Sequence, residues 1–217
     1  DALPISRARG GKRLFMAVHP LDIGLEGSQL TAVAGHSGSG KSTLLNMLAG
    51  ILTPTAGSVR IDGTDLYSLR DEERSRLRNE RIGLVPQGHT ALRALTVLDN
   101  VLLPSILYSR DEAPAERARE LLSAVGLSDL ADAAPTELSG GELRRMAIAR
   151  ALLMDPAIVL ADEPTAGLDH ANATAVLTLL RDAADRGAAV LVVSHEAEAR
   201  SFADRCYAME DGHLSED

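Results

Sequence analysis

Short apolar runs alternate with amphipathic, helix-like patterns along most of the chain. The segments expected to form strands are Leu30 to Ala34, Ile82 to Val85, Ala157 to Ala161, Ala188 to Val193 and Arg205 to Met209, with Val59 to Ile61 as a short antiparallel strand closed by Asp62-Gly63. The segments with helical patterns are Ser42 to Ala49, Arg70 to Arg81, Val97 to Leu107, Ala115 to Val125, Glu142 to Leu153 and Asn172 to Ala184. This alternation predicts an α/β fold with a mostly parallel sheet.

Helical signals dominate one continuous stretch, from Thr96 to Leu153. A chain of 217 residues is long enough for one large domain that carries a subdomain. We therefore expect a single domain over residues 1–217, with a helical subdomain of approximately residues 88–153 inserted in a core made of 1–87 and 154–217.

Composition narrows the functional classes. The net charge of −9 argues against nucleic acid as a partner, because phosphate-backbone binding needs a basic face. No apolar run approaches the roughly 20 residues that a membrane span requires, so contact with a membrane has to come through a partner. The single cysteine, Cys206, excludes an internal disulfide and suits a reducing cytoplasm.

Gly35 to Ser42 fits the pattern G-x-x-x-x-G-K-[ST] at every fixed position and lies between a predicted strand and a predicted helix. Its expected nucleotide-binding residues are Gly35, His36, Ser37, Gly38, Ser39, Gly40, Lys41, Ser42 and Thr43. Backbone N–H groups and the helix N-terminus favour phosphate binding, with Lys41 on the β- and γ-phosphates and Ser42 on Mg²⁺. A merely flexible glycine loop is the alternative, and the strand–loop–helix context disfavours it. We call Gly35–Ser42 the phosphate loop.

Two carboxylates, Asp162 and Glu163, follow a predicted buried strand. Ligands of α/β sheets bind beyond the carboxyl ends of the strands, so both acids should face the phosphate loop. Asp162 is suited to hold Mg²⁺ through water, and Glu163 is suited to polarise the attacking water. An exposed acidic cap at the end of the strand is the alternative interpretation.

Leu138-Ser139-Gly140-Gly141-Glu142 predicts a second anion-binding helix N-terminus, because a serine cap and two glycines open a helix there. Alone the string indicates only a helix cap. With the phosphate loop, the acidic pair and the following Arg144 to Leu152, it resembles the signature of ATP-binding cassette (ABC) ATPases. That resemblance implies a phosphate-loop NTPase core, a small antiparallel β subdomain and an inserted helical subdomain.

Further matches to the ABC family follow in order. Gln87 resembles the glutamine that contacts Mg²⁺ and the nucleophilic water, and His195 resembles the histidine that contacts the γ-phosphate. Ala166 to Asp169 resembles the loop that couples two sites across a dimer. A lone histidine at a strand end is more often structural, and the ordered set of motifs reverses that expectation for His195 only.

The resemblance also implies the assembly. Ser139, Gly140, Gly141, Glu142 and Asp169 would act in trans, on the nucleotide of a second copy of the chain. Glu163, His195, Gln87 and Lys41 would be catalytic, and Ser42, Gln87 and Asp162 would hold Mg²⁺. Segments such as Leu95 to Val101 and Ala161 to Thr165 look like the ATPases of lipoprotein-releasing, macrolide-exporting and cell-division systems.

The chain departs from the family pattern at the position expected to contact the adenine base. An aromatic residue usually stacks on adenine upstream of the phosphate loop, and Arg9 stands at that position here. A guanidinium plane can stack on a purine, while a solvated Arg9 with Phe15 in the core is the alternative. His36 occupies a position often held by proline.

The sequence therefore predicts an ATP- and Mg²⁺-dependent subunit of an ABC transporter. It would form a homodimer around two ATP molecules and bind an integral membrane permease at the inner face of the cell membrane, through the surface around Gln87 to Asn100. The alternative is a nucleotide-gated regulator of a cell-wall or signalling membrane complex. A soluble repair or translation ATPase and a simple phosphotransferase are disfavoured, and the substrate is left open.

Overall fold

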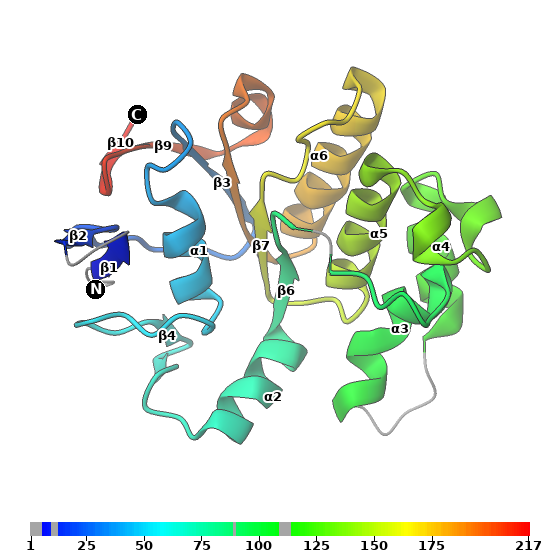
Figure 1. Ribbon diagram of the computed structural model, residues 1–217, viewed down its shortest axis with the longest axis horizontal. Coiled ribbons are helices and arrows are strands. Elements are labelled where there is room, and N and C mark those ends of the chain that lie inside the picture. Colours follow the sequence, from blue (N-terminus) through cyan, green and yellow to red (C-terminus); the bar gives the residue numbers. More distant parts are fainter. Residues whose placement is uncertain (1–5, 10–12, 89, 109–113) are drawn as a thin grey trace.

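The computed structural model describes the chain except for residues 1–5, 10–12, 89 and 109–113. Within the described residues, a six-stranded sheet has the order β10-β9-β3-β8-β7-β6 (Figure 1). Its strands are β3 Gln29–Ala34, β6 Ile82–Val85, β7 Ile158–Asp162, β8 Ala189–Ser194, β9 Arg205–Glu210 and β10 His213–Glu216. All neighbours are parallel except β10, which is antiparallel to β9. The predicted mostly parallel sheet is confirmed.

The central strands are apolar along their whole length because both faces of the sheet are covered. Every residue of β8 is buried. Its side chains alternate between two clusters: Val190 and Val192 pack with α5 and α6, whereas Leu191 and Val193 pack with α1 on the opposite face. The sheet is therefore the middle layer between two hydrophobic cores.

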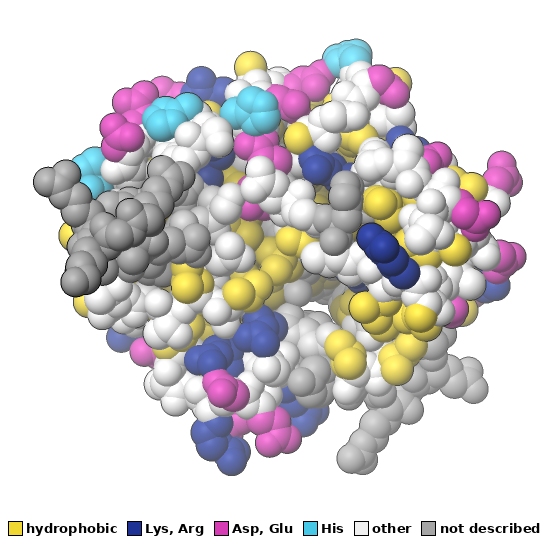
Figure 2. Space-filling view, viewed as in Figure 1, with side chains coloured by type: hydrophobic (Ala, Val, Ile, Leu, Met, Phe, Trp, Pro, Cys, Tyr) yellow, Lys and Arg dark blue, Asp and Glu magenta, His cyan; other side chains and the backbone are white. Residues whose placement is uncertain are grey.

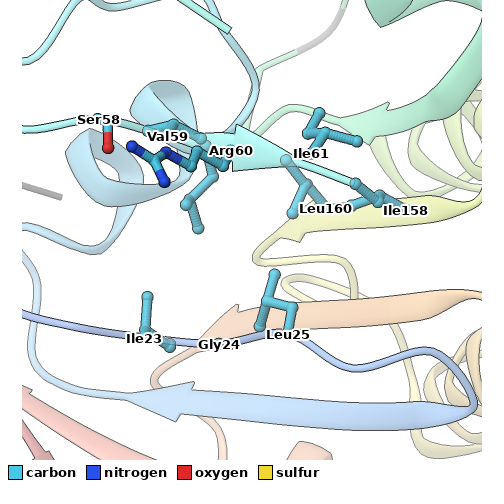
Figure 3. Close-up of a pocket in the computed structure, with 10 residues that line it drawn as sticks. Ile23, Gly24, Leu25, Ser58, Val59, Arg60, Ile61, Ile158 and Leu160 are labelled. Atoms are coloured by element: carbon cyan, nitrogen blue, oxygen red, sulfur yellow. The ribbon is translucent and has the colours of Figure 1, made fainter. Parts of the chain in front are cut away.

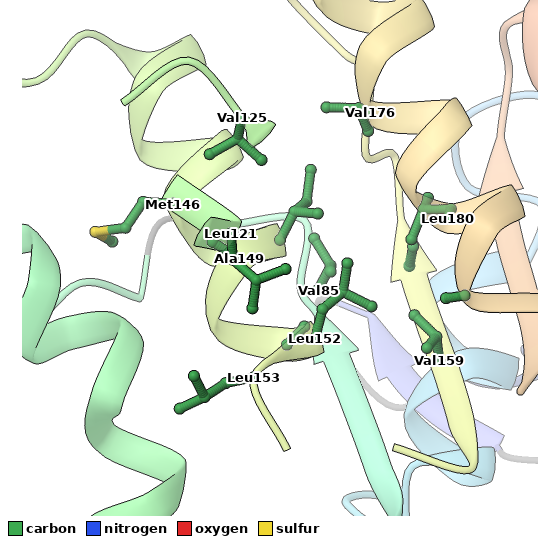
Figure 4. Packing of buried hydrophobic residues seen from close by; sticks show 14 of the residues in the cluster. Val85, Leu121, Val125, Met146, Ala149, Leu152, Leu153, Val159, Val176 and Leu180 are labelled. Atoms are coloured by element: carbon green, nitrogen blue, oxygen red, sulfur yellow. The ribbon is translucent and has the colours of Figure 1, made fainter. Parts of the chain in front are cut away.

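The helices are α1 Lys41–Leu48, α2 Asp71–Arg81, α3 Val97–Tyr108, α4 Ala115–Ala124, α5 Gly140–Leu152 and α6 His170–Asp185. Helices α3, α4 and α5 gather on one side of the molecule (Figure 1). Figure 4 shows Leu152 of α5 next to Val85 of β6, whereas Met146 points from the opposite side of α5, away from the strands. Because α5 packs both against the other helices of this group and against the sheet, the helical part and the sheet share one hydrophobic core.

Several boundaries differ from the sequence predictions. Helix α5 begins at Gly140 and α6 at His170, each two residues before the predicted start, because the caps are Ser139 and Asp169. The predicted antiparallel strand is β4 Arg60–Ile61, paired with β5 Thr64–Asp65. Elements without a sequence prediction are the paired strands β1 Ser6–Arg9 and β2 Arg13–Met16, β10, and the 3₁₀ helices Ser128–Leu130, Pro135–Glu137 and Ala197–Phe202.

A cavity of about 370 Å³ lies between the extended segment around Ile23 and Leu25 and strand β4 (Figure 3). Ile158 and Leu160 of β7 also line it. Ile158 is the first residue of β7, whereas Asp162 is the last. The cavity therefore lies away from the predicted phosphate site.

No helix in the described part of the chain combines the length and the apolarity needed to cross a bilayer.

Asp204 fixes the start of β3. Its carboxylate accepts hydrogen bonds from the N–H of Leu30 (2.7 Å) and from Arg181 of α6 (2.5 Å). The bond from Arg181, with that from Leu30, holds the pKa of Asp204 below its usual range. A carboxyl group with a lowered pKa in the folded protein stabilises it above its unfolded pKa, and this contribution is lost as the pH falls.

We predict that Asp204→Asn lowers the free energy of unfolding at pH 7 by about 1 kcal/mol, because the half-exposed pair with Arg181 is screened by solvent. Urea unfolding of both proteins at pH 7 and pH 4 measures the difference, which should shrink at the lower pH. Asp182→Asn, an exposed acid on the same helix as Arg181, is the control. A difference that does not depend on pH would contradict the assignment.

Candidate nucleotide site

The phosphate loop connects β3 to the N-terminus of α1, where unpaired backbone N–H groups favour anions. Gly38 and Gly40 have positive φ angles of 85° and 109°. A Cβ atom on Gly40 would also collide with the carbonyl oxygen of Ala17, and one on Gly35 with that of Met209. The glycines at positions 35 and 40 are therefore required by close backbone approach.

Lys41 is only 6% exposed and lies inside the loop that precedes it. Its Nζ donates to the carbonyl oxygens of Gly35 (2.6 Å) and His36 (3.0 Å). The same Nζ lies 3.9 Å from Oε1 of Glu163. A buried ammonium group held by backbone carbonyls and facing a carboxylate is placed to bind an anionic group at the mouth of the loop.

Asp162, at the end of β7, is 4% exposed, and its Oδ1 has no hydrogen-bond partner. Burial raises the pKa of this carboxyl group, although a hydrogen bond from Ser42 in the first turn of α1 opposes the rise. An unpartnered buried carboxylate oxygen beside a hydroxyl group is a donor set that suits a hard divalent cation. The predicted pair of metal ligands, Ser42 and Asp162, is thus brought together.

Glu163 occupies the left-handed region with φ 51°, which is uncommon for a residue with a side chain. Its N–H donates to the carbonyl oxygen of Val193 (2.8 Å) on β8. Its Oε2 accepts from the Ser194 hydroxyl (3.1 Å) and bonds Nδ1 of His195 (2.9 Å). The neighbouring strands β7 and β8 therefore join the predicted water-polarising acid to the predicted histidine.

His195 is 58% exposed, so its ring reaches outward from this buried pair. The hydrogen bond to Glu163, together with the negative charge of that group, raises the pKa of His195. The imidazole consequently keeps its proton to higher pH than an isolated histidine.

Ser139 caps α5 through a reciprocal arrangement with Glu142. The Glu142 N–H donates to the Ser139 hydroxyl (3.3 Å), and Ser139 N–H and Oγ donate to Oε2 of Glu142 (2.7 Å each). These hydrogen bonds from Ser139 lower the pKa of Glu142. Asp169 caps α6 by accepting hydrogen bonds from the main-chain N–H and the side-chain amide of Asn172, and these bonds lower the pKa of Asp169.

The structure brings five predicted residues together and leaves others apart. The group that meets consists of Lys41, Ser42, Asp162, Glu163 and His195. Across the described residues, no hydrogen bond or ion pair joins Ser139–Glu142 or Asp169 to the phosphate loop of the same chain. Gln87 is exposed. Its main-chain carbonyl oxygen, and not its side-chain amide, accepts the hydrogen bond from Arg144. The Arg9 side chain lies outside the described part, so its adenine contact stays a prediction.

Arg144 is a residue that the sequence reasoning did not single out. It donates to the carbonyl oxygens of Glu163 (2.8 Å), Ala166 (2.7 Å) and Gln87 (3.4 Å), which belong to three of the predicted functional segments. Its position four residues after Gly140, on one face of α5, was the available signal.

Comparison with known proteins agrees with this arrangement. Residues 18–166 match the family described as ABC transporter. The chain is 41% identical over 212 residues to the lipoprotein-releasing system ATP-binding protein LolD of Chromohalobacter salexigens, covering 96% of this chain and 89% of that protein. It is also 41% identical over 204 residues to the macrolide export ATP-binding/permease protein MacB of Rhodopseudomonas palustris, covering 93% of this chain and 31% of that longer protein.

Solved structures extend the comparison to the fold. A dimeric post-hydrolysis state of the ATP-binding cassette MJ0796, bound to ADP and Pi, superposes with a TM-score of 0.91 at 32% identity. The match covers 99% of this chain and 96% of that one. A second dimeric structure of the same cassette gives a TM-score of 0.92.

The chain belongs to the ABC transporter family. Within that family it is an ATP-binding, ATP-hydrolysing subunit of the kind found in lipoprotein-releasing and macrolide-exporting systems. The predicted family, fold class and ATPase activity are confirmed.

We predict that Asp162→Asn stabilises the metal-free protein at pH 7, because it removes a buried carboxylate with an unpartnered oxygen. The melting temperature should rise by about 2–4 °C, which corresponds to about 1 kcal/mol for a chain of this size. Because the pKa of Asp162 is raised in the folded protein, this advantage is complete only above that raised pKa, and it should shrink as the pH falls towards about 4. Differential scanning calorimetry in EDTA measures it.

The control is Asp132→Asn, which removes an exposed carboxylate far along the chain from the site. An equal rise in melting temperature for both variants would show that net charge, rather than burial of Asp162, causes the effect.

Proposed function

We propose that the chain works as half of an ATP-sandwich dimer that hydrolyses ATP with Mg²⁺ and drives movement in an integral membrane permease. The observation that carries this proposal is the meeting of Glu163 with Lys41 and His195, beside the unpartnered oxygen of Asp162. These groups can bind a phosphate, hold a cation and orient water within one small region.

In this proposal, Gly35 to Thr43 wrap the phosphates of ATP with backbone N–H groups, and Lys41 turns its ammonium group towards the β- and γ-phosphates. Ser42, Gln87 and Asp162 would hold Mg²⁺, which when bound would supply positive charge beside the phosphates. The donor set of Ser42 and Asp162 supports this assignment, because one buried oxygen of Asp162 has no protein partner.

Glu163 would orient the water that attacks the γ-phosphorus and take a proton from it, while the bond from the γ-phosphorus to the bridging oxygen breaks and ADP leaves. Ser194 and His195 fix the Glu163 carboxylate from the β8 side. His195 is exposed enough to reach the γ-phosphate as well, and its raised pKa favours the cationic form that such a contact needs.

The second half of each site would come from another copy of the chain. Ser139, Gly140, Gly141 and Glu142 would cap the γ-phosphate in trans at the N-terminus of α5, and Asp169 would lie at the dimer contact. The dimeric form of the solved relatives supports this arrangement. The self-contained caps at Ser139 and Asp169, which leave the chain's own phosphate loop untouched, agree with it.

The permease would dock on the cytoplasmic side at the surface around Gln87 to Asn100, holding the chain peripherally at the inner face of the membrane. Ala91, Arg93 and Leu138 border a cavity of about 340 Å³ there. A second hollow of about 310 Å³, with exposed Ile51 and Leu107, opens between the core and α3 (Figure 2). Residues 88–153 would move as the helical subdomain when ATP binds.

Glu163→Gln should keep ATP affinity within about threefold and lower turnover by at least about 100-fold, because the amide cannot accept the proton from water. The variant should also accumulate as an ATP-bound dimer in size-exclusion chromatography. Glu116→Gln, an exposed acid on α4, is the matched control. Wild-type turnover by the Glu163 variant would remove this residue from the mechanism.

Ser139→Arg should abolish turnover while the monomer still binds ATP, since the bulky cation blocks the face that caps the other subunit's nucleotide. Equilibrium binding of a fluorescent ATP analogue at concentrations below dimerisation, paired with steady-state hydrolysis, separates the two effects. Ser123→Arg adds the same side chain to an exposed position on α4 and serves as control. Severe loss of monomer binding in the Ser139 variant would contradict the trans arrangement.

A further inference from the structure

Arg144 connects three segments that are distant in sequence. Its Nη1 donates to the carbonyl oxygens of Glu163 (2.8 Å) and Ala166 (2.7 Å), and its Nη2 lies 3.4 Å from that of Gln87. All three acceptors are main-chain atoms. The guanidinium group therefore holds the backbone of these segments and leaves the Glu163 and Gln87 side chains free for chemistry.

The contact with Glu163 matters most, because the backbone of that residue is in a disfavoured conformation. At φ 51°, its main chain has to be held by its surroundings. The N–H of Glu163 is held by Val193 of β8, and its carbonyl oxygen is held by Arg144 of α5. With both sides of the residue fixed, the carboxylate is aimed at Lys41 and His195.

Arg144 also joins Glu163 to the helix that carries Ser139. Helix α5 runs from Gly140 to Leu152, and its middle is buried by Met146, Ala147, Ile148 and Ala149. A helix packed in this way moves as a rigid unit. Any displacement of its N-terminus is therefore passed through Arg144 to the main chain of Glu163.

A residue that only anchored α5 would make no contact with Glu163, and Arg150 is such a residue. Arg150, near the other end of α5, donates to the carbonyl oxygen of Thr90 (3.0 Å) and to its hydroxyl group. That arginine fastens the same helix without contacting Glu163. The two residues thus offer a matched pair, in which one attaches α5 and the other attaches α5 specifically to the proposed water-orienting acid.

We propose that Arg144 is a positioning residue for ATP hydrolysis: it holds the Glu163 main chain in its left-handed conformation and ties the carboxylate to the helix that begins at Ser139. The inference rests on the proposed function, in which Glu163 orients the attacking water. Arg144 acts through Glu163, so its removal should disturb the chemical step and spare ATP binding.

The test compares Arg144→Met, Arg144→Lys, Arg150→Met and Arg119→Met, the last removing an exposed arginine on α4. Arg144→Met should lower kcat by about 10- to 100-fold, as expected for a displaced reacting group, with the KM for ATP within about threefold. Arg144→Lys, whose single ammonium group cannot span all three carbonyls, should lie between wild type and Arg144→Met. It is also the deciding variant if thermal melting shows that Arg144→Met is unfolded.

A double-mutant cycle on the single-turnover rate distinguishes a positioning role of Arg144 from a merely structural one. If Arg144 acts through Glu163, adding Arg144→Met to Glu163→Gln should change the single-turnover rate by less than about twofold. Arg150→Met added to Glu163→Gln should lower the rate by the same factor as it does in wild type. Additive losses for Arg144, or a wild-type kcat in a folded Arg144 variant, would overturn the inference.

The outcomes separate this inference from the proposed function. If the wild type does not hydrolyse ATP, or if Glu163→Gln hydrolyses it at the wild-type rate, the proposed function fails and the inference fails with it. If wild type, Arg119→Met and Glu163→Gln behave as expected while Arg144→Met keeps full kcat, the role of Arg144 alone is overturned.

Discussion

Buried charge at the carboxyl ends of β3, β7 and β8 is the constraint on which the rest of the structure depends. Lys41, Asp162 and Glu163 are each less than a tenth exposed. Burying such groups is costly unless they are paired and hydrogen-bonded. Lys41 finds two carbonyl oxygens and a carboxylate, while Asp162 keeps one oxygen without a partner. The unpartnered oxygen of Asp162 leaves a place for a cation, and the buried ammonium group of Lys41 leaves a place for an anion. Under the proposed function, a divalent cation and a triphosphate would occupy them.

The sheet makes this concentration of charge possible. Because β3, β8 and β7 are neighbouring parallel strands, the phosphate loop, His195 and the acidic pair leave the sheet at the same edge. Two hydrophobic cores, one on each face, keep the strands in register. The apolar interior thus provides the rigidity that holds like charges close to one another.

Much of this could be predicted from the sequence, because the relevant signals are local. The buried strands are unbroken apolar runs, and the phosphate loop has fixed glycines whose close contacts the structure then explains. The left-handed conformation of Glu163 could not be predicted, since a glutamate gives no sign of a positive φ angle. Its pairing with His195 follows from strand order, which the motif alone does not contain.

The contacts of Arg144 could not be predicted either, because every residue has a main-chain carbonyl acceptor and such acceptors leave no pattern in the sequence. Strand β5 has only two residues, too few for a periodic signal, although its partner β4 was predicted. Helix starts were misplaced by two residues at α5 and α6 because the glycines after Ser139 and the residues after Asp169 are weak helix formers in isolation. Capping side chains override that weakness once the caps are made.

Helix α5 connects these separate features of the structure. Its N-terminus presents the Ser139 cap, its middle is packed in the core shared by the sheet and the helical part, and its arginines hold the main chain of Glu163 and of Thr90. The N-terminus of α5 is therefore joined to the main chain of Glu163 through one buried helix and one side chain, that of Arg144. Under the proposed dimer, the same helix would sense the second nucleotide and set the geometry of the first. Coupling between the sites then needs no element beyond those that already stabilise the fold.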